Sequence, residues 1–287
     1  MKRTINYKLV FALSSAVLLF SCQKDVSKQQ DQNLNSLSAN KSIDDLSEYK
    51  SMQNQKYNTF KGPEMQMGNG KVRSWISISH TGVPQEIGVE LTDDALKGLP
   101  TSVPEGEEIN FIIPLHKKAG EVTAFDHLEI DWNPFGHPPP GIYDKPHFDF
   151  HFYKITVAEQ MAIPPYTPAT ASLFDMAPAP GYLPAIYQPI PGGVPEMGKH
   201  WFDPSSPEWQ GQPFTSTFIY GTYKGAVTFF EPMITMAVLQ SGQSFHIPFP
   251  QPTRFAPDHT YYPTQYNIYE DSNTHKHYVT LSNFVLR

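Results

Sequence analysis

The chain has 287 residues, a net charge of −7 at neutral pH and a single cysteine, Cys22. An acidic chain without runs of basic residues argues against nucleic acid as a partner, because that affinity depends largely on neutralising phosphates. One cysteine excludes an internal disulfide, so a hydrophobic core must hold the fold together.

Residues 1–21 have the composition of a signal peptide, with a basic start followed by an apolar run from Leu9 to Phe20. The run is too short to span a bilayer comfortably, since a membrane helix needs about 20 residues. It ends in Leu19-Phe20-Ser21-Cys22, which resembles a bacterial lipoprotein box, in which the cysteine is acylated and becomes the new N-terminus. The alternatives are an ordinary cleaved signal and a short anchor.

The lipoprotein resemblance implies a location and a partner. Gln23-Lys24-Asp25, directly after Cys22, is similar to the export signals of Bacteroidota surface lipoproteins. We therefore expect the protein in the bacterial cell envelope, attached to the outer membrane through a lipid on Cys22, on its periplasmic or its outer side.

Residues 22–65 are predicted to be a flexible tether, because polar residues dominate them and large apolar residues are rare. Such a composition buries too little surface to offset the entropy lost on ordering. The tether would hold the domain away from the membrane. Residues 66–287 are predicted to be one β-rich domain, which is long enough to bury a sizeable core.

Short strands separated by turn signals follow along this domain, and they predict an all-β fold with little helix. The expected strands cover residues 72–78, 86–91, 108–115, 128–132, 146–155, 214–223, 226–230, 234–239, 266–270 and 277–286. A capped turn at 92–96 and one helical turn at 157–161 are expected between them. The segment 162–195 is dense in Pro and Gly, so we expect a long irregular loop that packs over the domain with its aromatic residues. Together these features predict a single antiparallel sandwich or barrel.

The stretch Pro146-His147-Phe148-Asp149-Phe150-His151-Phe152-Tyr153 organises the rest of the chain. Its residues alternate with period two, which is typical of a β-strand whose successive side chains leave opposite faces. One face therefore carries three phenylalanines, and the other carries two imidazoles with a carboxylate between them. The polar face must point at solvent, at a network of hydrogen bonds between strands, or at something that the protein binds.

This stretch also belongs to a wider pattern. The pieces are Phe125-Asp126-His127-Leu128-Glu129-Ile130-Asp131-Trp132, Gly136-His137-Pro138-Pro139, the stretch from Tyr143 to Tyr153, Met197-Gly198-Lys199-His200-Trp201, Tyr220-Gly221-Thr222-Tyr223 and Tyr262-Pro263-Thr264-Gln265-Tyr266. In this order they resemble a family of secreted bacterial proteins of unknown function, typified by a Thermus protein under sigma-E/anti-sigma-E control. The likeness covers roughly residues 72–287, and it implies no particular chemistry.

Imidazole and carboxylate are the usual ligands of divalent transition metals, and zinc is the ion we expect first. Residues four apart on a strand lie about 13 Å apart, so His147 and His151 cannot both reach one ion unless the strand is bulged. Other ligands must therefore come from elsewhere in the chain. The candidate metal ligands are His147, Asp149, His151, His200, Glu196 and Glu231, with His137 at the pocket rim. Glu196 and His200 would share a face only if their segment were helical.

Two hypotheses of different class follow. The first is a metal-dependent enzyme or metal-binding protein that uses these residues. The second is a non-catalytic surface module that binds a glycan, another small molecule or a protein through exposed Tyr and Trp, although aromatic residues also fill β-cores. Catalysis by cysteine is excluded because Cys22 is the lone cysteine. The chain also has neither a Gly-x-Ser-x-Gly elbow nor a phosphate-binding glycine loop. Reaction, substrate and assembly into a homo-oligomer stay open.

Overall fold

Antiparallel β-sheets form the framework of the structure, a computed structural model that describes residues 57–102 and 109–287. All of these residues belong to one unit, Gln53–Arg287. The predicted signal peptide, Cys22 and most of the predicted tether lie outside the described residues. Within them, no helix has both the length and the apolar character needed to cross a membrane.

Two seven-stranded antiparallel sheets, sheet A and sheet B, build the domain. Sheet A has the order β1-β3-β4-β15-β14-β12, and β2 pairs with β3. Its strands are β1 (Tyr57–Lys61), β2 (Met65–Met67), β3 (Gly70–Ser79), β4 (Pro84–Thr92), β12 (Phe245–Pro248), β14 (Gln265–Asp271) and β15 (Lys276–Ser282).

Sheet B has the order β5-β6-β7-β11-β10-β9-β8, so the central strand β7 lies between β6 and β11. Its strands are β5 (Asn110–Pro114), β6 (His127–Asn133), β7 (His147–Tyr153), β8 (Gln188–Pro189), β9 (Lys199–Phe202), β10 (Ser216–Tyr223) and β11 (Ala226–Thr235). A small third sheet pairs β13 (Tyr261–Tyr262) with β16 (Val285–Leu286). Each large sheet ends in edge strands, so the fold is an open sandwich and not a closed barrel.

Helices in the described part are short and lie in the connections. They are η1 (Asp93–Leu96), α3 (Lys117–Val122), α4 (Val157–Met161), α5 (Ala171–Phe174), η2 (Pro207–Gln210) and α6 (Met236–Leu239). The predicted helical turn at 157–161 is α4. It begins there because the Thr156 hydroxyl accepts from the Glu159 amide while the Glu159 carboxylate accepts from the Thr156 amide, which is a capping box.

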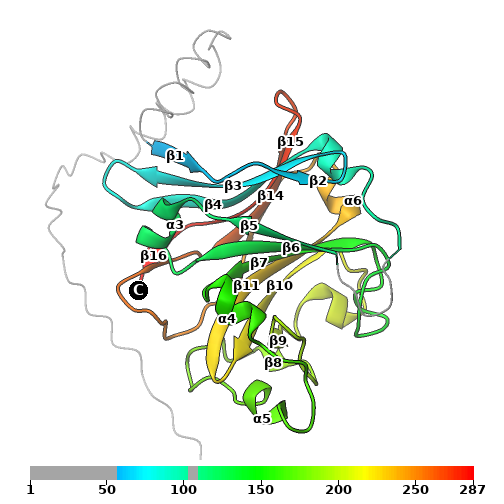
Figure 1. Cartoon of the computed structure of the whole chain (residues 1–287), viewed down its shortest axis with the longest axis vertical. Coiled ribbons are helices and arrows are strands. Elements are labelled where there is room, and N and C mark those ends of the chain that lie inside the picture. Colours follow the sequence, from blue (N-terminus) through cyan, green and yellow to red (C-terminus); the bar gives the residue numbers. More distant parts are fainter. Residues whose placement is uncertain (1–56, 103–108) are drawn as a thin grey trace, which may run out of the picture. The chain divides into compact units, whose positions relative to one another are not determined.

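The main core lies between the two sheets and is built by alternation. Phe148, Phe150 and Phe152 of β7 are fully buried in it, together with Ile87 and Val89 of β4. Burial of each such side chain contributes about 1.5–3 kcal/mol. Figure 1 shows β3 and β4 of sheet A on one side of this core and β5, β6 and β7 on the other, with α4, α5 and β8–β9 beyond sheet B. Because the phenylalanines face the core, the histidines of β7 face away from sheet A.

The structure confirms the all-β prediction and corrects it in two places, at residues 226–239 and at the start of the domain. Residues 226–235 form one strand, because the ladder between β11 and β7 resumes at Met233 after Pro232, which cannot donate a hydrogen bond. Residues 236–239 form helix α6 instead of the end of a strand, since the Thr235 hydroxyl caps its first turn by accepting from the Val238 amide.

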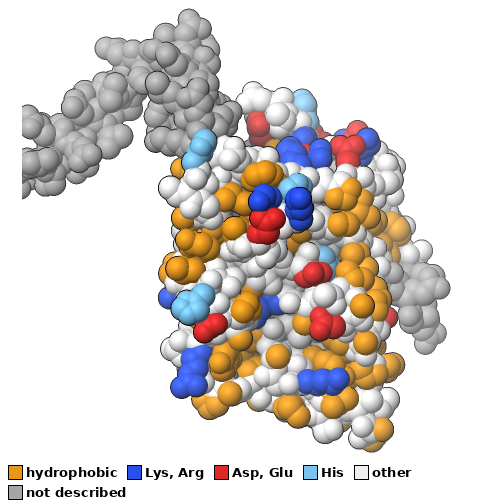
Figure 2. All heavy atoms as spheres, turned by 60° about the vertical axis from the view of Figure 1, so that its left-hand side comes forward, with side chains coloured by type: hydrophobic (Ala, Val, Ile, Leu, Met, Phe, Trp, Pro, Cys, Tyr) orange, Lys and Arg blue, Asp and Glu red, His pale blue; other side chains and the backbone are white. Residues whose placement is uncertain are grey.

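The second correction concerns the start of the domain. Residues 57–61, inside the predicted tether, form strand β1, which pairs with β3 along its whole length. Phe60 packs against the main core, and this burial orders a segment whose composition is otherwise polar. On the face in view in Figure 2, Lys and Arg side chains are dispersed among acidic and hydrophobic ones.

Candidate metal centre

The polar row of β7 lies on the outer face of sheet B, the face turned away from sheet A. His147, Asp149 and His151 are only 0%, 5% and 1% exposed. Burial of ionisable groups is costly unless they are paired or bind a metal ion. The solvent-facing interpretation of this row is therefore wrong, and each of these side chains needs a partner inside the protein.

Neighbouring strands add further polar groups to the same face. In the ladder between β6 and β7, Glu129 lies opposite His151, and Asp131 lies opposite Asp149. On the other side of β7, Glu231 of β11 is 1% exposed and lies between Phe229 and Met233 in the sequence. Three adjacent strands thus place four buried carboxylates on one face of one sheet.

A cavity of about 700 Å³ lies over this face and separates it from the loops that cover it. His137, Asp149, Asp131 and His200 line the polar part of the cavity. Its apolar wall includes Trp132, Pro138, Pro139, Tyr143, Tyr166, Ile190, Val194 and Met197. The predicted packing of the Pro/Gly-rich loop over the domain is confirmed, since residues 190–194 form part of this wall. The loop shields the carboxylates from bulk water while leaving space for a ligand.

His137, His147 and Asp149 form the first group of possible metal ligands. His147 Nε2 lies 3.1 Å from Asp149 Oδ1, and His137 Nε2 lies 3.2 Å from Asp149 Oδ2. The atoms of the first contact are poorly aligned for a hydrogen bond, and neither has another hydrogen-bond partner among the described residues. Two buried polar atoms therefore lie close together without forming a well-aligned hydrogen bond.

Backbone carbonyls fix the orientation of both imidazoles in this group. His147 Nδ1 donates to the carbonyl of Lys145 at 2.6 Å, and His137 Nδ1 donates to the carbonyl of Pro138 at 2.7 Å. The Nε2 atoms then point at Asp149 and can act as ligands. Histidines that bind metals commonly donate their second ring nitrogen in this way, which sets the tautomer.

The Asp149 carboxylate is held in place by a third neighbour, Asn133 of β6. Its side-chain amide donates to Asp149 Oδ2 at 2.8 Å. The sequence analysis did not select Asn133, Glu129 or Asp131. The signal was present, because β6 alternates polar and apolar residues with the same period as β7.

His151, His200 and Glu231 form the second group. His151 Nε2 lies 3.6 Å from Glu231 Oε1, and His200 Nε2 lies 3.7 Å from Glu231 Oε2. These separations exceed ordinary hydrogen-bond lengths. A third group, Glu129, Asp131 and His151, shares His151 with the second. The four predicted ligands on β7 and β9 therefore do not converge on one point but divide between two positions.

Burial and the neighbouring charges shift the pKa values of His137 and Asp149 in the first group. Burial alone would lower the pKa of His137, but the charge of Asp149 raises it to about 9. The pKa of Asp149 is well below its ordinary value, because the charges of His147 and His137 outweigh the effect of burial. Metal binding by the first group must therefore displace a proton from His137.

At the second position, burial shifts the pKa values of Glu231 and His200 in favour of their neutral forms. Burial raises the pKa of Glu231 well above its ordinary value and outweighs the lowering by the charge of His151, while the charges of Asp149 and Asp131 raise it further. Burial also lowers the pKa of His200 to about 3, so its imidazole is neutral and can act as a ligand.

Glu196 does not join either position. It lies in the left-handed region, with φ 61°, in the turn before β9, and its segment is not helical. Its amide donates to the Ile163 carbonyl, and its carbonyl accepts from the Tyr153 hydroxyl. The condition under which Glu196 and His200 would share a face, a helical segment, is therefore not met. His137, predicted at the rim, is a member of the first group and is partly exposed to the cavity.

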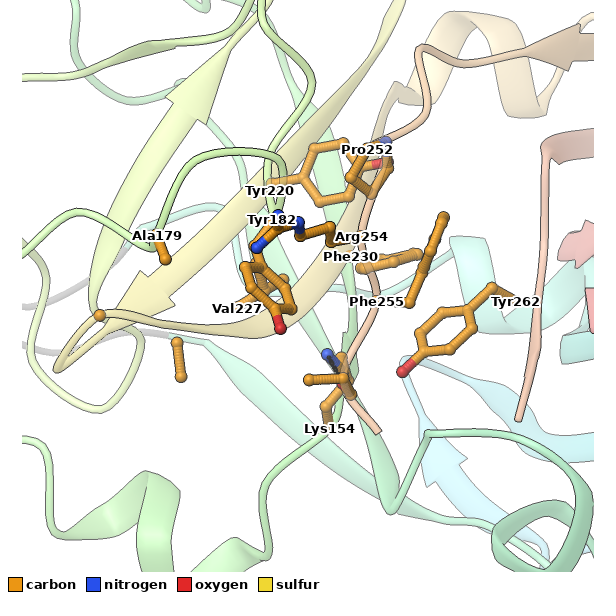
Figure 3. Close-up of a pocket in the computed structure, with 13 residues that line it drawn as sticks. Lys154, Ala179, Tyr182, Tyr220, Val227, Phe230, Pro252, Arg254, Phe255 and Tyr262 are labelled. Atoms are coloured by element: carbon orange, nitrogen blue, oxygen red, sulfur yellow. Dashed lines mark hydrogen bonds between the residues drawn. The ribbon is translucent and has the colours of Figure 1, made fainter. Parts of the chain in front are cut away.

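A separate, smaller cavity of about 190 Å³ contains none of the predicted site residues. Figure 3 shows its aromatic side chains, Tyr182, Tyr220, Phe230, Phe255 and Tyr262, around the cations of Lys154 and Arg254. Burial lowers the pKa of Lys154 to about 8. Its ammonium donates to the Ala256 carbonyl, so this cation is part of the packing of the loop.

Known proteins add one finding to this geometry. Residues 79–132 match the TTHB210-like family model, described as hypothetical protein TTHB210. This match supports the family resemblance, and it includes Glu129 and Asp131 of β6 but ends before Asn133. No curated protein and no solved structure matches the chain. The matched description names no activity, so the chemistry must be argued from the site.

Proposed function

We propose that this protein binds a divalent transition metal, zinc first, at His137, His147 and Asp149. The contact between His147 Nε2 and Asp149 Oδ1 carries the proposal, because these buried atoms lie 3.1 Å apart, are poorly aligned for a hydrogen bond and have no other hydrogen-bond partner among the described residues. Two ligands of one tetrahedral zinc, each about 2.0–2.1 Å from the ion, lie about 3.3 Å apart. The spacing in this group therefore suits atoms that share a cation.

The surroundings of the group support the same proposal. His147 and His137 each use Nδ1 on a backbone carbonyl, and Asn133 donates to Asp149. This is the outer hydrogen bonding that metal ligands usually have, since it raises their basicity and fixes their orientation. The cavity beside the group leaves room for a further ligand, a water molecule or a substrate, as metal centres that do chemistry require.

We further propose that the domain works in the bacterial cell envelope as a lipoprotein. The lipoprotein box at Cys22 and the apolar run before it support a lipid anchor in the outer membrane. Labelling with a radioactive fatty acid tests the anchor. Label should appear on the wild type and be absent from Cys22→Ser.

Zinc titration of the purified protein by isothermal calorimetry tests the metal proposal. The wild type should bind zinc, and His147→Ala or Asp149→Asn should weaken binding at this position at least 100-fold. The matched control is His246→Ala, which removes an exposed histidine of sheet A. The proposal fails if the wild type binds less than a tenth of an equivalent of zinc, cobalt, nickel or manganese.

A second candidate function rests on the outer face of sheet A. There Tyr278 stacks on Tyr269 with ring centroids 4.8 Å apart, and Trp75 meets Tyr278 edge-on at 6.0 Å. Two hollows of about 280 and 430 Å³ adjoin Tyr269 and are lined by carboxylate, amide and imidazole groups. Aromatic rings beside many hydrogen-bonding groups suit a neutral oligosaccharide.

A glycan array tests this second candidate. The wild type should bind at least one neutral oligosaccharide, and Tyr278→Ala should lose that binding, whereas Tyr166→Ala, in the loop over sheet B, should retain it. Absence of any bound glycan, with correct folding shown by circular dichroism, would refute a glycan-binding role for this face.

A further inference from the structure

We infer that the outer face of sheet B holds a second metal position, formed by His151, His200 and Glu231 and distinct from the first. The inference rests on the proposed function, because it extends the same buried face from one cation to two. His147 and His151 are four residues apart on an unbulged stretch of β7, which places their Cα atoms about 13 Å apart. One ion with ligands at about 2.1 Å cannot bind both imidazoles.

The geometry of the second group is that of ligands around a shared cation. The Nε2 atoms of His151 and His200 each face a different oxygen of Glu231, at 3.6 and 3.7 Å. These distances are too long for hydrogen bonds but close to the separation of about 3.3 Å between two ligands on one zinc. Small movements of side chains would bring all three to bonding distance.

Burial makes this arrangement costly without a cation. His151 and Glu231 are each 1% exposed, and neither His151 Nε2 nor Glu231 Oε2 has a hydrogen-bond partner among the described residues. A buried polar atom left without a partner loses its hydration without compensation. The ligands come from three strands of one rigid sheet, β7, β9 and β11, so the position does not depend on a flexible loop.

Asp131 connects the second position to the first. Its Oδ2 lies 3.2 Å from His151 Nδ1, on the side of the ring away from Glu231. A carboxylate behind a histidine is a common outer partner at metal sites and raises the basicity of the ligating nitrogen. In the ladder, Asp131 also lies opposite Asp149, a ligand of the first position. The two positions therefore lie side by side along β7, with Asp131 between them.

The balance of charge on this face agrees with two divalent ions. Glu129, Asp131, Asp149 and Glu231 are all 5% exposed or less. The ion-pair partners of Asp149 and Glu231 are histidines and include neither lysine nor arginine. A divalent ion at each position would supply the positive charge that these two ligand carboxylates otherwise take from histidines.

Metal counting on the purified full chain tests the inference. Each protein is stripped with a chelator, loaded with zinc, passed through a desalting column and measured by mass spectrometry of the metal. The wild type should retain two equivalents of zinc. His147→Ala should retain one, His200→Ala should retain one, and the double variant should retain none. His246→Ala, on sheet A, should retain two.

Other zinc stoichiometries would overturn either the second position or the proposed function. One equivalent in the wild type, lost in His147→Ala and kept in His200→Ala, overturns the second position and leaves the proposed function standing. One equivalent lost in both single variants overturns the inference in favour of one shared site. No zinc in the wild type overturns the proposed function itself.

Loss of folding must be separated from loss of a ligand. Glu231→Gln keeps the shape of the side chain and should also retain one equivalent, with a near-ultraviolet circular dichroism spectrum like that of the wild type. Cobalt loading adds an independent readout, because the visible absorption per protein should fall by about half in Glu231→Gln. An unchanged cobalt spectrum in the folded Glu231→Gln variant would contradict the role of Glu231 as a ligand.

Discussion

The outer faces of the two sheets use buried carboxylates in opposite ways. On sheet A, Glu90 is 5% exposed and binds the ammonium groups of Lys61 and Lys276 at 2.7 and 2.9 Å. On sheet B, Asp149 is also 5% exposed, but its charged neighbours are two histidines. A carboxylate at the same depth is neutralised in one place by lysine and in the other by groups that can bind a metal.

This difference separates a structural network from a candidate site. A lysine partner leaves a carboxylate satisfied, because the ammonium group supplies both the charge and the hydrogen bonds. A histidine partner can give up its proton and leave its nitrogen as a ligand. Loops cover the outer face of sheet B and enclose a cavity of about 700 Å³ over it. The contrast can be tested by changing one face at a time.

The largest expected effect comes from the metal itself. Zinc at a thousand times its dissociation constant should stabilise the folded protein by about 4 kcal/mol, since only the folded state presents the ligands together. The melting temperature should rise by about 10 °C and fall again on addition of a chelator. Differential scanning calorimetry measures this shift. A melting temperature that does not respond to zinc would remove the distinction between the two faces.

Asn133 should have the next largest effect, because it orients Asp149 by a hydrogen bond of 2.8 Å. Asn133→Ala should weaken zinc binding about 10- to 100-fold, or about 1.4–2.7 kcal/mol. Asn267→Ala is the matched control, since Asn267 donates to Thr280 on sheet A. Calorimetric titration of both variants decides the point, and equal zinc affinities in the two would contradict the role of Asn133.

Glu90→Gln should change stability without changing metal affinity. The substitution removes the charge that binds Lys61 and Lys276, whose side chains are 38% and 28% exposed. Solvent screens partly exposed pairs, so the free energy of unfolding should fall by only about 1 kcal/mol. Urea denaturation and zinc titration of the same protein measure the two quantities. A weaker zinc affinity in this variant would show that the two faces are coupled.

The smallest expected effect is a pH dependence on sheet A. Burial raises the pKa of Glu86 above its ordinary value of 4.5, although Thr280 and Tyr269 donate hydrogen bonds to it. The folded state then holds the Glu86 proton to a higher pH than the unfolded state, so stability falls as the pH rises above 4.5.

Glu86→Gln should remove this part of the slope and, at neutral pH, change the free energy of unfolding by no more than about 1 kcal/mol. Urea denaturation at several pH values between 4 and 7 compares the variant with the wild type. Parallel stability curves for the two proteins would show that Glu86 does not titrate in this range.

Local sequence patterns determined most of the strands and the central polar row. The alternation of Phe148, Phe150 and Phe152 with His147 and His151 fixes the two faces of β7, because side chains of a strand leave it on alternate sides. The same rule applied to β6 would have identified Glu129 and Asp131. The capping box at Thr156 and Glu159 likewise fixed α4 through contacts three residues apart.

Tertiary structure alone decided which side chains meet. Sequence reasoning grouped His147, Asp149, His151 and His200 as ligands of one candidate site, and it left open whether Glu196 shares a face with His200. The order of strands instead placed Glu231 between His151 and His200, and a loop brought His137 to Asp149. Such contacts depend on strand order and on loop paths between residues distant in sequence, and a repeat of two residues along one strand carries no information about them.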